Sequence, residues 1–191
     1  MLPALSPHTK HIVIDLQRVF AEPHGWHVPS IAGILPNVLT LCQTTAENTL
    51  YSRFITPPKP EDAPGRWQNL YQAYPQVTGL DPAILDLIDP LTQIAQPSQI
   101  FDKTTYSIFP AIQPHLGQTD TLILSGAETD ACVYASLLSA VDLGLRVIIA
   151  TDAVTSSDQA AHNATLNIIA RRLPAQVECA TTAEIIAAWP K

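Results

Sequence analysis

Residues 121–133 read TLILSGAETDACV and join a buried strand to the start of a helix. The apolar, β-branched run at 121–124 is typical of a strand inside a sheet. Apolar residues with helical spacing continue to Leu145, and Thr129 or Asp130 is the candidate N-cap of that helix. The segment therefore predicts a strand that is followed at once by a helix.

Cys132 falls in the first turn of this predicted helix, just after the carboxyl end of the strand. Free backbone N–H groups and the positive end of the helix dipole favour a thiolate at such a position. The arrangement is that of a nucleophile elbow, although the nucleophile is sulfur and no G-x-S-x-G motif is present. A small buried cysteine that packs the helix against the sheet fits the same pattern, so both interpretations stay open at this point.

Apolar runs and helical patterns alternate along the rest of the chain. Further strands are predicted at residues 11–16, 49–55, 99–103, 146–150 and 175–179, and helices at 31–47, 83–88, 158–173 and 181–189. Because strands and helices alternate, the sequence predicts an α/β fold in which helices cover both faces of a parallel sheet.

The long segment at residues 56–80 breaks this alternation. Four prolines interrupt it, so we predict irregular structure there. Trp67, Tyr71 and Tyr74 add aromatic bulk to the segment. Irregular connections of this length are typical of lids and binding loops, and a packed surface loop over a helix end is equally compatible with the pattern.

Length and composition restrict the class of protein. A chain of 191 residues fits one domain, 1–191, and 47% hydrophobic against 14% charged residues disfavours long disorder. The net charge of −7 argues against nucleic-acid binding, because no basic stripe is available to neutralise phosphates. No apolar run reaches about 18 residues, the first residues do not resemble a signal peptide, and three widely spaced cysteines cannot complete a disulfide framework. We therefore expect a cytoplasmic protein without membrane or nucleic-acid partners.

Three reactive side chains follow predicted strands at their carboxyl ends. They are Asp15, Lys103 and Cys132. In parallel α/β sheets the ligand binds outside these ends, so the three side chains are expected to meet at one rim. A thiol that meets a carboxylate and an ammonium has both a proton acceptor and a charge partner, which is the combination that nucleophilic catalysis requires.

Three spaced motifs give the chain its resemblance to a known family. The first is D-x-Q-x-x-F from Asp15 to Phe20, the second places Lys103 after the third strand, and the third is the turn from Gly126 to Val133. In this order they resemble the isochorismatase-like cysteine hydrolases, whose relatives include nicotinamidases and N-carbamoylsarcosine amidases. The resemblance covers nearly the whole chain, and it implies a three-layer α/β/α, Rossmann-like fold with a six-stranded parallel sheet.

The resemblance also implies roles for the residues of these motifs. Cys132 would be the nucleophile, Asp15 would accept the thiol proton and pass it to the leaving amine, and Lys103 would lower the thiol pKa and hold Asp15 ionised. A cis peptide bond is expected between Ala127 and Glu128, and the N–H groups of Glu128 and Cys132 would form an oxyanion hole. The implied reaction is hydrolysis of a C–N bond in a small amide or carbamoyl compound through a thioester.

The predicted pocket lies around this centre. The residues predicted to bind substrate are Gln17, Phe20, Trp67 and Tyr106. Glu128 and Asp130 would disfavour a thiolate if their carboxylates turned inward, so we expect both side chains to point away from Cys132.

The family comparison also bears on cofactors and partners. Nicotinamidases carry an aspartate and histidines after the second strand that bind a metal, whereas residues 53–58 here read RFITPP. We therefore expect no metal and no other cofactor, a small-molecule substrate, and self-association into a dimer or tetramer. Two alternatives remain: an isochorismatase-type enzyme that cleaves a vinyl ether, and a non-catalytic binding protein on the same fold.

Overall fold

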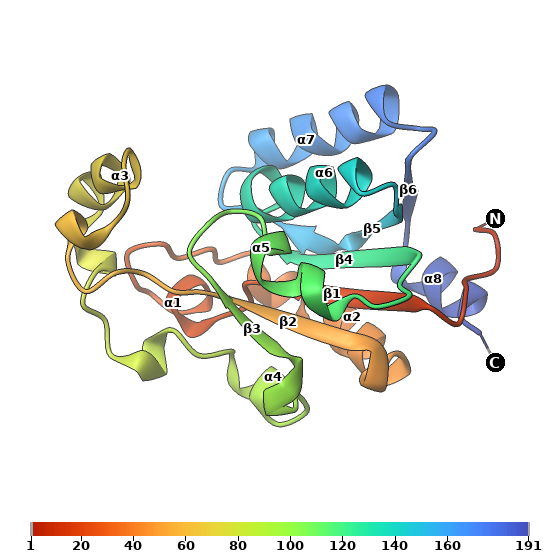
Figure 1. Cartoon of the computed structure of the whole chain (residues 1–191), viewed down its shortest axis with the longest axis horizontal. Coiled ribbons are helices and arrows are strands. Elements are labelled where there is room, and N and C mark those ends of the chain that lie inside the picture. Colours follow the sequence, from red (N-terminus) through yellow and green to blue (C-terminus); the bar gives the residue numbers. More distant parts are fainter. Residues whose placement is uncertain (1, 191) are drawn as a thin grey trace.

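Six strands form one parallel sheet in the computed structural model, which describes residues 2–190 (Figure 1). The strands are β1 (Thr9–Ile14), β2 (Thr49–Phe54), β3 (Ile100–Lys103), β4 (Thr121–Ala127), β5 (Arg146–Thr155) and β6 (Val177–Ala180). Their order across the sheet is β3-β2-β1-β4-β5-β6, and every neighbouring pair is parallel. The strand order reverses between β1 and β4, and ligands of such sheets bind beyond the carboxyl ends of the strands at this point.

Helices cover both faces of the sheet, as the alternation of patterns predicts. One face carries α1 (Arg18–Ala21), α2 (Ile31–Thr44) and α8 (Thr182–Ala188), and the other carries α5 (Phe109–Ile112), α6 (Tyr134–Asp142) and α7 (Gln159–Arg172) (Figure 1). The long β2–β3 connection contains α3 (Trp67–Ala73) and α4 (Asp89–Thr92). One-turn 3₁₀ helices are found at Ala46–Asn48, Pro60–Asp62, Pro75–Val77, Pro82–Ile84, Pro97–Gln99 and Gln113–His115. The three layers around a six-stranded parallel sheet confirm the predicted fold class.

The core lies along the central strands. Ile12 and Ile14 of β1 and Leu122 and Ile123 of β4 are fully buried. Each such side chain contributes about 1.5–3 kcal/mol through removal of its apolar surface from water. Within residues 2–190, none of the helices combines the length and apolar content that a membrane-spanning segment needs.

The strand predicted at 121–124 continues to Ala127. Gly126 permits the extension, because its φ is +111° and a Cβ at this position would lie 2.1 Å from the carbonyl oxygen of Ile14. A residue without a side chain therefore lets the end of β4 approach β1 closely. As a result, the ends of these two strands and the residues that follow them share one rim.

The prediction that residues 56–80 are wholly irregular was wrong. The segment contains α3 and two 3₁₀ turns, Pro60–Asp62 and Pro75–Val77. Proline stands at the start of both turns, where its missing N–H costs no hydrogen bond. The predicted helix at 83–88 was also wrong, since a 3₁₀ turn ends at Ile84 and α4 begins only at Asp89.

A buried histidine ties β1 to its neighbours. His11 is completely buried, its Nε2 lies 2.8 Å from Ser125 Oγ, and its Nδ1 lies 3.3 Å from Thr45 Oγ1 and 3.5 Å from Thr49 Oγ1. Burial lowers the pKa of His11 to about 3. The imidazole is therefore neutral in the folded protein over the ordinary pH range, and its partners are hydroxyl groups that can both donate and accept.

This histidine is expected to make the protein less stable in acid. Because its pKa is lower in the folded chain than in the unfolded one, its contribution is present above about pH 6.5 and is lost as pH falls toward 3. At pH 4.5 the loss amounts to about 3 kcal/mol. Urea unfolding of wild type and His11→Gln at pH 7.5 and 4.5 measures it, because glutamine keeps a hydrogen-bonding side chain without titrating. An equal loss of unfolding free energy in both proteins would contradict this assignment.

Candidate active site

Asp15 stands immediately after β1 in an uncommon backbone conformation. Its φ is +50°, and asparagine and aspartate are the side chains that tolerate this left-handed region best. The Asp15 amide donates to Ser52 Oγ at 3.0 Å, and the Ser52 hydroxyl donates to Asp15 Oδ1 at 2.5 Å. Ser52 thus fixes both the backbone and the carboxylate of Asp15 from the neighbouring strand β2.

Lys103 reaches this carboxylate from the end of β3. Its Nζ lies 2.7 Å from Asp15 Oδ2, 3.3 Å from Cys132 Sγ and 3.0 Å from the carbonyl oxygen of Thr105. The ammonium also lies 4.5 Å from the ring centroid of Phe54, which closes the end of β2. The side chains of Lys103 and Asp15 are each 1% exposed, so the ion pair is screened from water.

The rim therefore brings together the three side chains that the sequence predicts to meet. Ser52 provides the hydrogen bond to Oδ1, and apart from Lys103 the other oxygen, Oδ2, has no hydrogen-bond partner among residues 2–190. A lone pair of Asp15 is thus available next to the ammonium that also touches the sulfur of Cys132. The shared contact with Lys103 places a candidate proton acceptor close to the thiol.

The turn that carries Cys132 differs from the predicted helix start. Residues Thr129–Val133 form a single π-helical turn before α6, and the carbonyl oxygen of Glu128 accepts from the amides of Ala131 and Val133. Neither predicted N-cap was correct. Thr129 Oγ1 bonds His162 Nδ1 at 2.8 Å, and Asp130 Oδ1 accepts from Ser156. π-turns of this kind are frequent at functional sites.

The predicted ionised state of Cys132 was wrong. Burial raises the pKa of the Cys132 thiol well above its usual range, and the charge of Asp15 raises it further. The Lys103 ammonium acts in the opposite direction, but it does not offset these two effects. The proton of Cys132 therefore stays on sulfur at neutral pH, while Asp15 and Lys103 form an ion pair.

We expect alkylation of Cys132 to report this protonated resting state. Its rate with iodoacetamide should keep rising beyond pH 9, because the thiolate is the reacting form. Removal of the neighbouring negative charge in Asp15→Asn should move the profile to lower pH. Mass-resolved peptides distinguish Cys132 from the buried Cys42 and the exposed Cys179. A full rate at pH 7 would mean that the sulfur is already ionised at rest.

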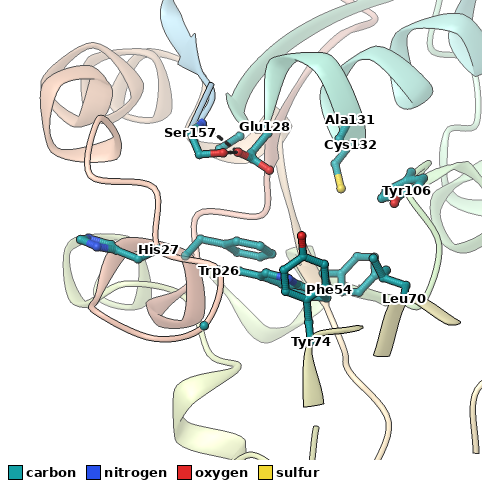
Figure 2. Close-up of a pocket in the computed structure, with 13 residues that line it drawn as sticks. Trp26, His27, Phe54, Leu70, Tyr74, Tyr106, Glu128, Ala131, Cys132 and Ser157 are labelled. Atoms are coloured by element: carbon teal, nitrogen blue, oxygen red, sulfur yellow. Dashed lines mark hydrogen bonds between the residues drawn. The ribbon is translucent and has the colours of Figure 1, made fainter. Parts of the chain in front are cut away.

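Cys132 opens into a pocket of about 360 Å³, a size suited to a small molecule (Figure 2). Its wall consists mainly of aromatic and small apolar residues, with a few polar groups. The lining residues are Phe20, Gly25, Trp26, His27, Phe54, Leu70, Tyr74, Tyr106, Ala127, Glu128, Ala131, Cys132 and Ser157. Asp15 and Lys103 lie behind Cys132 rather than on the wall, so a ligand would meet the sulfur first.

Two of the predicted substrate-binding residues, Phe20 and Tyr106, line this pocket, whereas Gln17 and Trp67 do not. Gln17 is completely buried, because its amide bonds both the N–H and the carbonyl of Phe54 and also the carbonyl of Leu85. It holds the end of β2 in place, and Phe54 in turn packs against the Lys103 ammonium. The pocket-wall prediction for Gln17 therefore does not match the structure.

Trp67 acts from behind the wall. Its ring centroid lies 4.8 Å from that of Tyr106 and 6.0 Å from that of Phe54, so it joins α3 to the β3–α5 loop. Trp26, which lines the pocket, contacts Tyr71 and Tyr74 of the same segment. The 56–80 segment is thus packed over the pocket through aromatic contacts, which agrees with the binding-loop interpretation.

The peptide bond between Ala127 and Glu128 is cis. Ala127, Glu128 and Cys132 all line the pocket, and the oxyanion hole expected from the amides of Glu128 and Cys132 stays a prediction. The Glu128 carboxylate bonds Ser157, but its side chain stays at the pocket, so the expectation that it points away was only partly correct. Asp130 is exposed and lies outside the lining, as expected.

In residues 2–190 no three His, Cys, Asp or Glu side chains lie close enough together to hold a metal ion. The residues that follow β2 are Ile55, Thr56 and Pro57, and none of them is a usual metal ligand. Among the histidines of the 21–29 loop, His27 lines the pocket, and His24 lies 3.5 Å from Glu22. Among residues 2–190 the side chains around this pocket therefore do not supply the three or four clustered ligands that a tetrahedral metal site requires.

Comparison with known proteins bears on the same fold and site. Isochorismatase domain-containing protein 2 from Bos taurus is 38% identical over 93 residues, which cover 47% of this chain and 42% of that protein. The match thus spans less than half the length of the curated relative. A cysteine hydrolase structure from Pseudomonas syringae has a TM-score of 0.81 at 28% identity, and the match covers 98% of this chain and 97% of that one.

A pyrazinamidase/nicotinamidase structure from Streptococcus mutans has a TM-score of 0.70 at 22% identity, over 88% of this chain and 99% of that one. This second likeness shows the fold alone. The family model described as the Isochorismatase domain matches residues 9–184. This range includes Asp15, Lys103 and Cys132, the three side chains that meet at the rim of the sheet. The chain therefore belongs to the isochorismatase-like hydrolase family.

Proposed function

We propose that this protein is a metal-independent cysteine hydrolase that cleaves a C–N bond of a small amide or carbamoyl compound through a thioester on Cys132. One observation carries the proposal. The Lys103 ammonium contacts both Asp15, at 2.7 Å, and Cys132, at 3.3 Å, at the inner end of a pocket of small-molecule size. A buried thiol next to a carboxylate with a free lone pair has its general base already in place.

In the first half of the reaction, Cys132 Sγ attacks the carbonyl carbon while Asp15 takes the thiol proton. The carbonyl oxygen becomes an oxyanion, which the amides of Glu128 and Cys132 would stabilise by about 2.7–4 kcal/mol per donor. Asp15 then gives the proton to the leaving nitrogen, the C–N bond breaks, and an amine or ammonia departs. The acyl group remains on sulfur as a thioester.

In the second half, Asp15 takes a proton from water and the resulting hydroxide attacks the thioester carbon. The C–S bond breaks, the proton returns to sulfur, and a carboxylic or carbamic acid leaves. Lys103 stays protonated throughout and offsets the negative charge that develops next to it. The high thiol pKa suits this cycle, because proton transfer accompanies attack and no standing thiolate is needed.

The comparisons with known proteins and the wall of the pocket both support the proposed hydrolase function. The structural neighbours include a cysteine hydrolase and a pyrazinamidase/nicotinamidase, and the names of both proteins describe hydrolysis. The aromatic wall formed by Phe20, Trp26 and Tyr106 suits a flat, largely apolar substrate. Self-association into a dimer or tetramer stays a prediction, which the mass of the protein in solution tests.

Trapping of the thioester tests the proposal directly. A panel of small aromatic and carbamoyl amides is incubated with the protein, quenched in acid, and analysed by intact mass and by ammonia release. We expect an adduct equal to the acyl group, located on Cys132, together with release of the amine. Catalytic release of the amine with no adduct, even in rapid quench, would contradict the thioester route.

A further inference from the structure

One carboxylate on the pocket wall has no cationic partner among residues 2–190. Glu128 lines the pocket and is half-buried, and among residues 2–190 no lysine, arginine or histidine forms an ion pair with it. The other charged pair of the site, Asp15 with Lys103, is internally neutral. With the Cys132 thiol protonated, Glu128 is therefore the carboxylate on the pocket wall whose charge is not offset by an ion pair.

Ser157 holds this carboxylate in a fixed direction. Glu128 Oε1 accepts from the Ser157 amide at 2.8 Å and also from the Ser157 hydroxyl. Figure 2 shows both bonds at one oxygen, with the second oxygen of Glu128 turned toward the open centre of the pocket. A carboxylate clamped at one oxygen is pre-organised to accept hydrogen bonds at the other, so little ordering is required when a ligand binds.

The opposite wall is aromatic. Trp26, Phe54 and Tyr74 face Cys132 and Glu128 across the pocket in Figure 2, and the rings of Phe20 and Trp26 are nearly parallel, at 6°. A flat molecule on these rings would have one end at the sulfur and another edge toward the Glu128 carboxylate. The negative charge of Glu128 also reaches Tyr106, whose pKa it helps to raise together with burial and the Cys132 sulfur.

We propose that the substrate is a small, flat amide bearing an ammonium, amidinium or similar N–H-rich group, which the Glu128 carboxylate binds while Cys132 attacks the amide carbon. This inference rests on the proposed function for the reaction, but the recognition itself involves only the pocket wall. A carboxylate with a charged donor makes a charge-assisted hydrogen bond, which is about twice as strong as a neutral one. An anionic substrate would meet a like charge in a partly water-excluded site, so the same residue rejects it.

Three probes of similar size separate charge from shape: 3-(aminomethyl)benzamide, its neutral isostere 3-ethylbenzamide, and 3-carbamoylbenzoate are cationic, neutral and anionic, respectively. Binding is measured by calorimetry on Cys132→Ala at pH 8. We expect the cation to bind at least about tenfold more tightly than the neutral probe, and the anion more weakly than both. Hydrolysis of the same probes by wild type is followed in parallel.

Charge removal at matched positions tests the assignment to Glu128. In Cys132→Ala/Glu128→Gln the preference for the cation over the neutral probe should fall to about twofold or less. Asp130→Asn on the same background removes one negative charge two residues away, outside the pocket, and should keep the preference. Ser157→Ala removes the hydroxyl bond to Glu128 Oε1 but keeps the bond from the residue 157 amide, so it should reduce the preference only in part. It provides a second variant if the Gln substitution is unstable.

The two proposals fail in different ways. Equal binding of the three probes, tighter binding of the anion, or a preference that survives loss of the Glu128 charge would overturn this inference, whatever the turnover. Charge-selective binding that disappears with Glu128→Gln, but without hydrolysis of any amide by wild type, would support the recognition and count only against the proposed reaction.

Discussion

Replacement of Cys132 by alanine is expected to lower kcat/KM for amide hydrolysis by roughly 10⁴-fold or more, because the nucleophile and the acyl carrier are lost together. The fold should be retained, with a change in unfolding free energy of about 1 kcal/mol, since only one small buried atom is removed. Steady-state kinetics on the substrate found by adduct trapping, together with urea unfolding, measures both quantities in one preparation.

Cys132→Ser is the matched control for shape. It keeps a polar atom near Lys103, but an alcohol gives up its proton far less readily than a thiol, so Asp15 cannot activate it to the same extent. We expect a loss comparable to that of the alanine variant and no adduct. Activity retained in Cys132→Ala would favour the ether-cleaving alternative, which does not use the sulfur. Absence of turnover and of adducts with every probe would favour a binding protein.

The fold was predictable because its strands are apolar runs between helical patterns. Parallel strands place their carboxyl ends at one rim, so Asp15, Lys103 and Cys132 could be expected to meet although they are far apart in the sequence. The sequence did not show how deeply they are buried. The predicted thiolate was wrong for this reason, since burial and Asp15 together outweigh Lys103 in setting the Cys132 pKa.

Other features of the site leave only a weak trace in the sequence. Ser52 is one of three polar residues in β2, beside Thr49 and Arg53, and nothing in the sequence distinguishes it as the partner of Asp15 on the neighbouring strand. Gln17 belongs to the first motif, but its bonds to Phe54 depend on the way β1 and β2 pair. The helix α3 was missed because the prolines of the 56–80 segment indicate irregular structure. Proline can also begin a helical turn, as Pro60 and Pro75 do in the 3₁₀ turns on either side of α3.

Removal of the Asp15 charge from its pair with Lys103 is expected to lower both stability and activity. Asp15→Asn keeps a residue that tolerates φ of +50°, but leaves the Lys103 ammonium buried without its counter-charge. Removal of one partner from a buried pair typically costs about 3–5 kcal/mol. The same change should lower kcat by about 10²–10⁴-fold, because the group that moves the proton is lost.

The double variant Asp15→Asn/Lys103→Met separates these two effects. A buried pair that is replaced as a whole by uncharged groups of similar volume leaves no isolated charge, so most of the lost stability should return. Activity should not return, because the proton acceptor is still absent and the ammonium next to Cys132 has also gone. Urea unfolding and steady-state kinetics of the two single variants and the double variant form a complete cycle. If each single variant lowers the free energy of unfolding by less than about 1 kcal/mol, the ion pair behaves like a solvated surface pair. That result would contradict the description of Asp15 and Lys103 as a buried pair that handles the proton of Cys132.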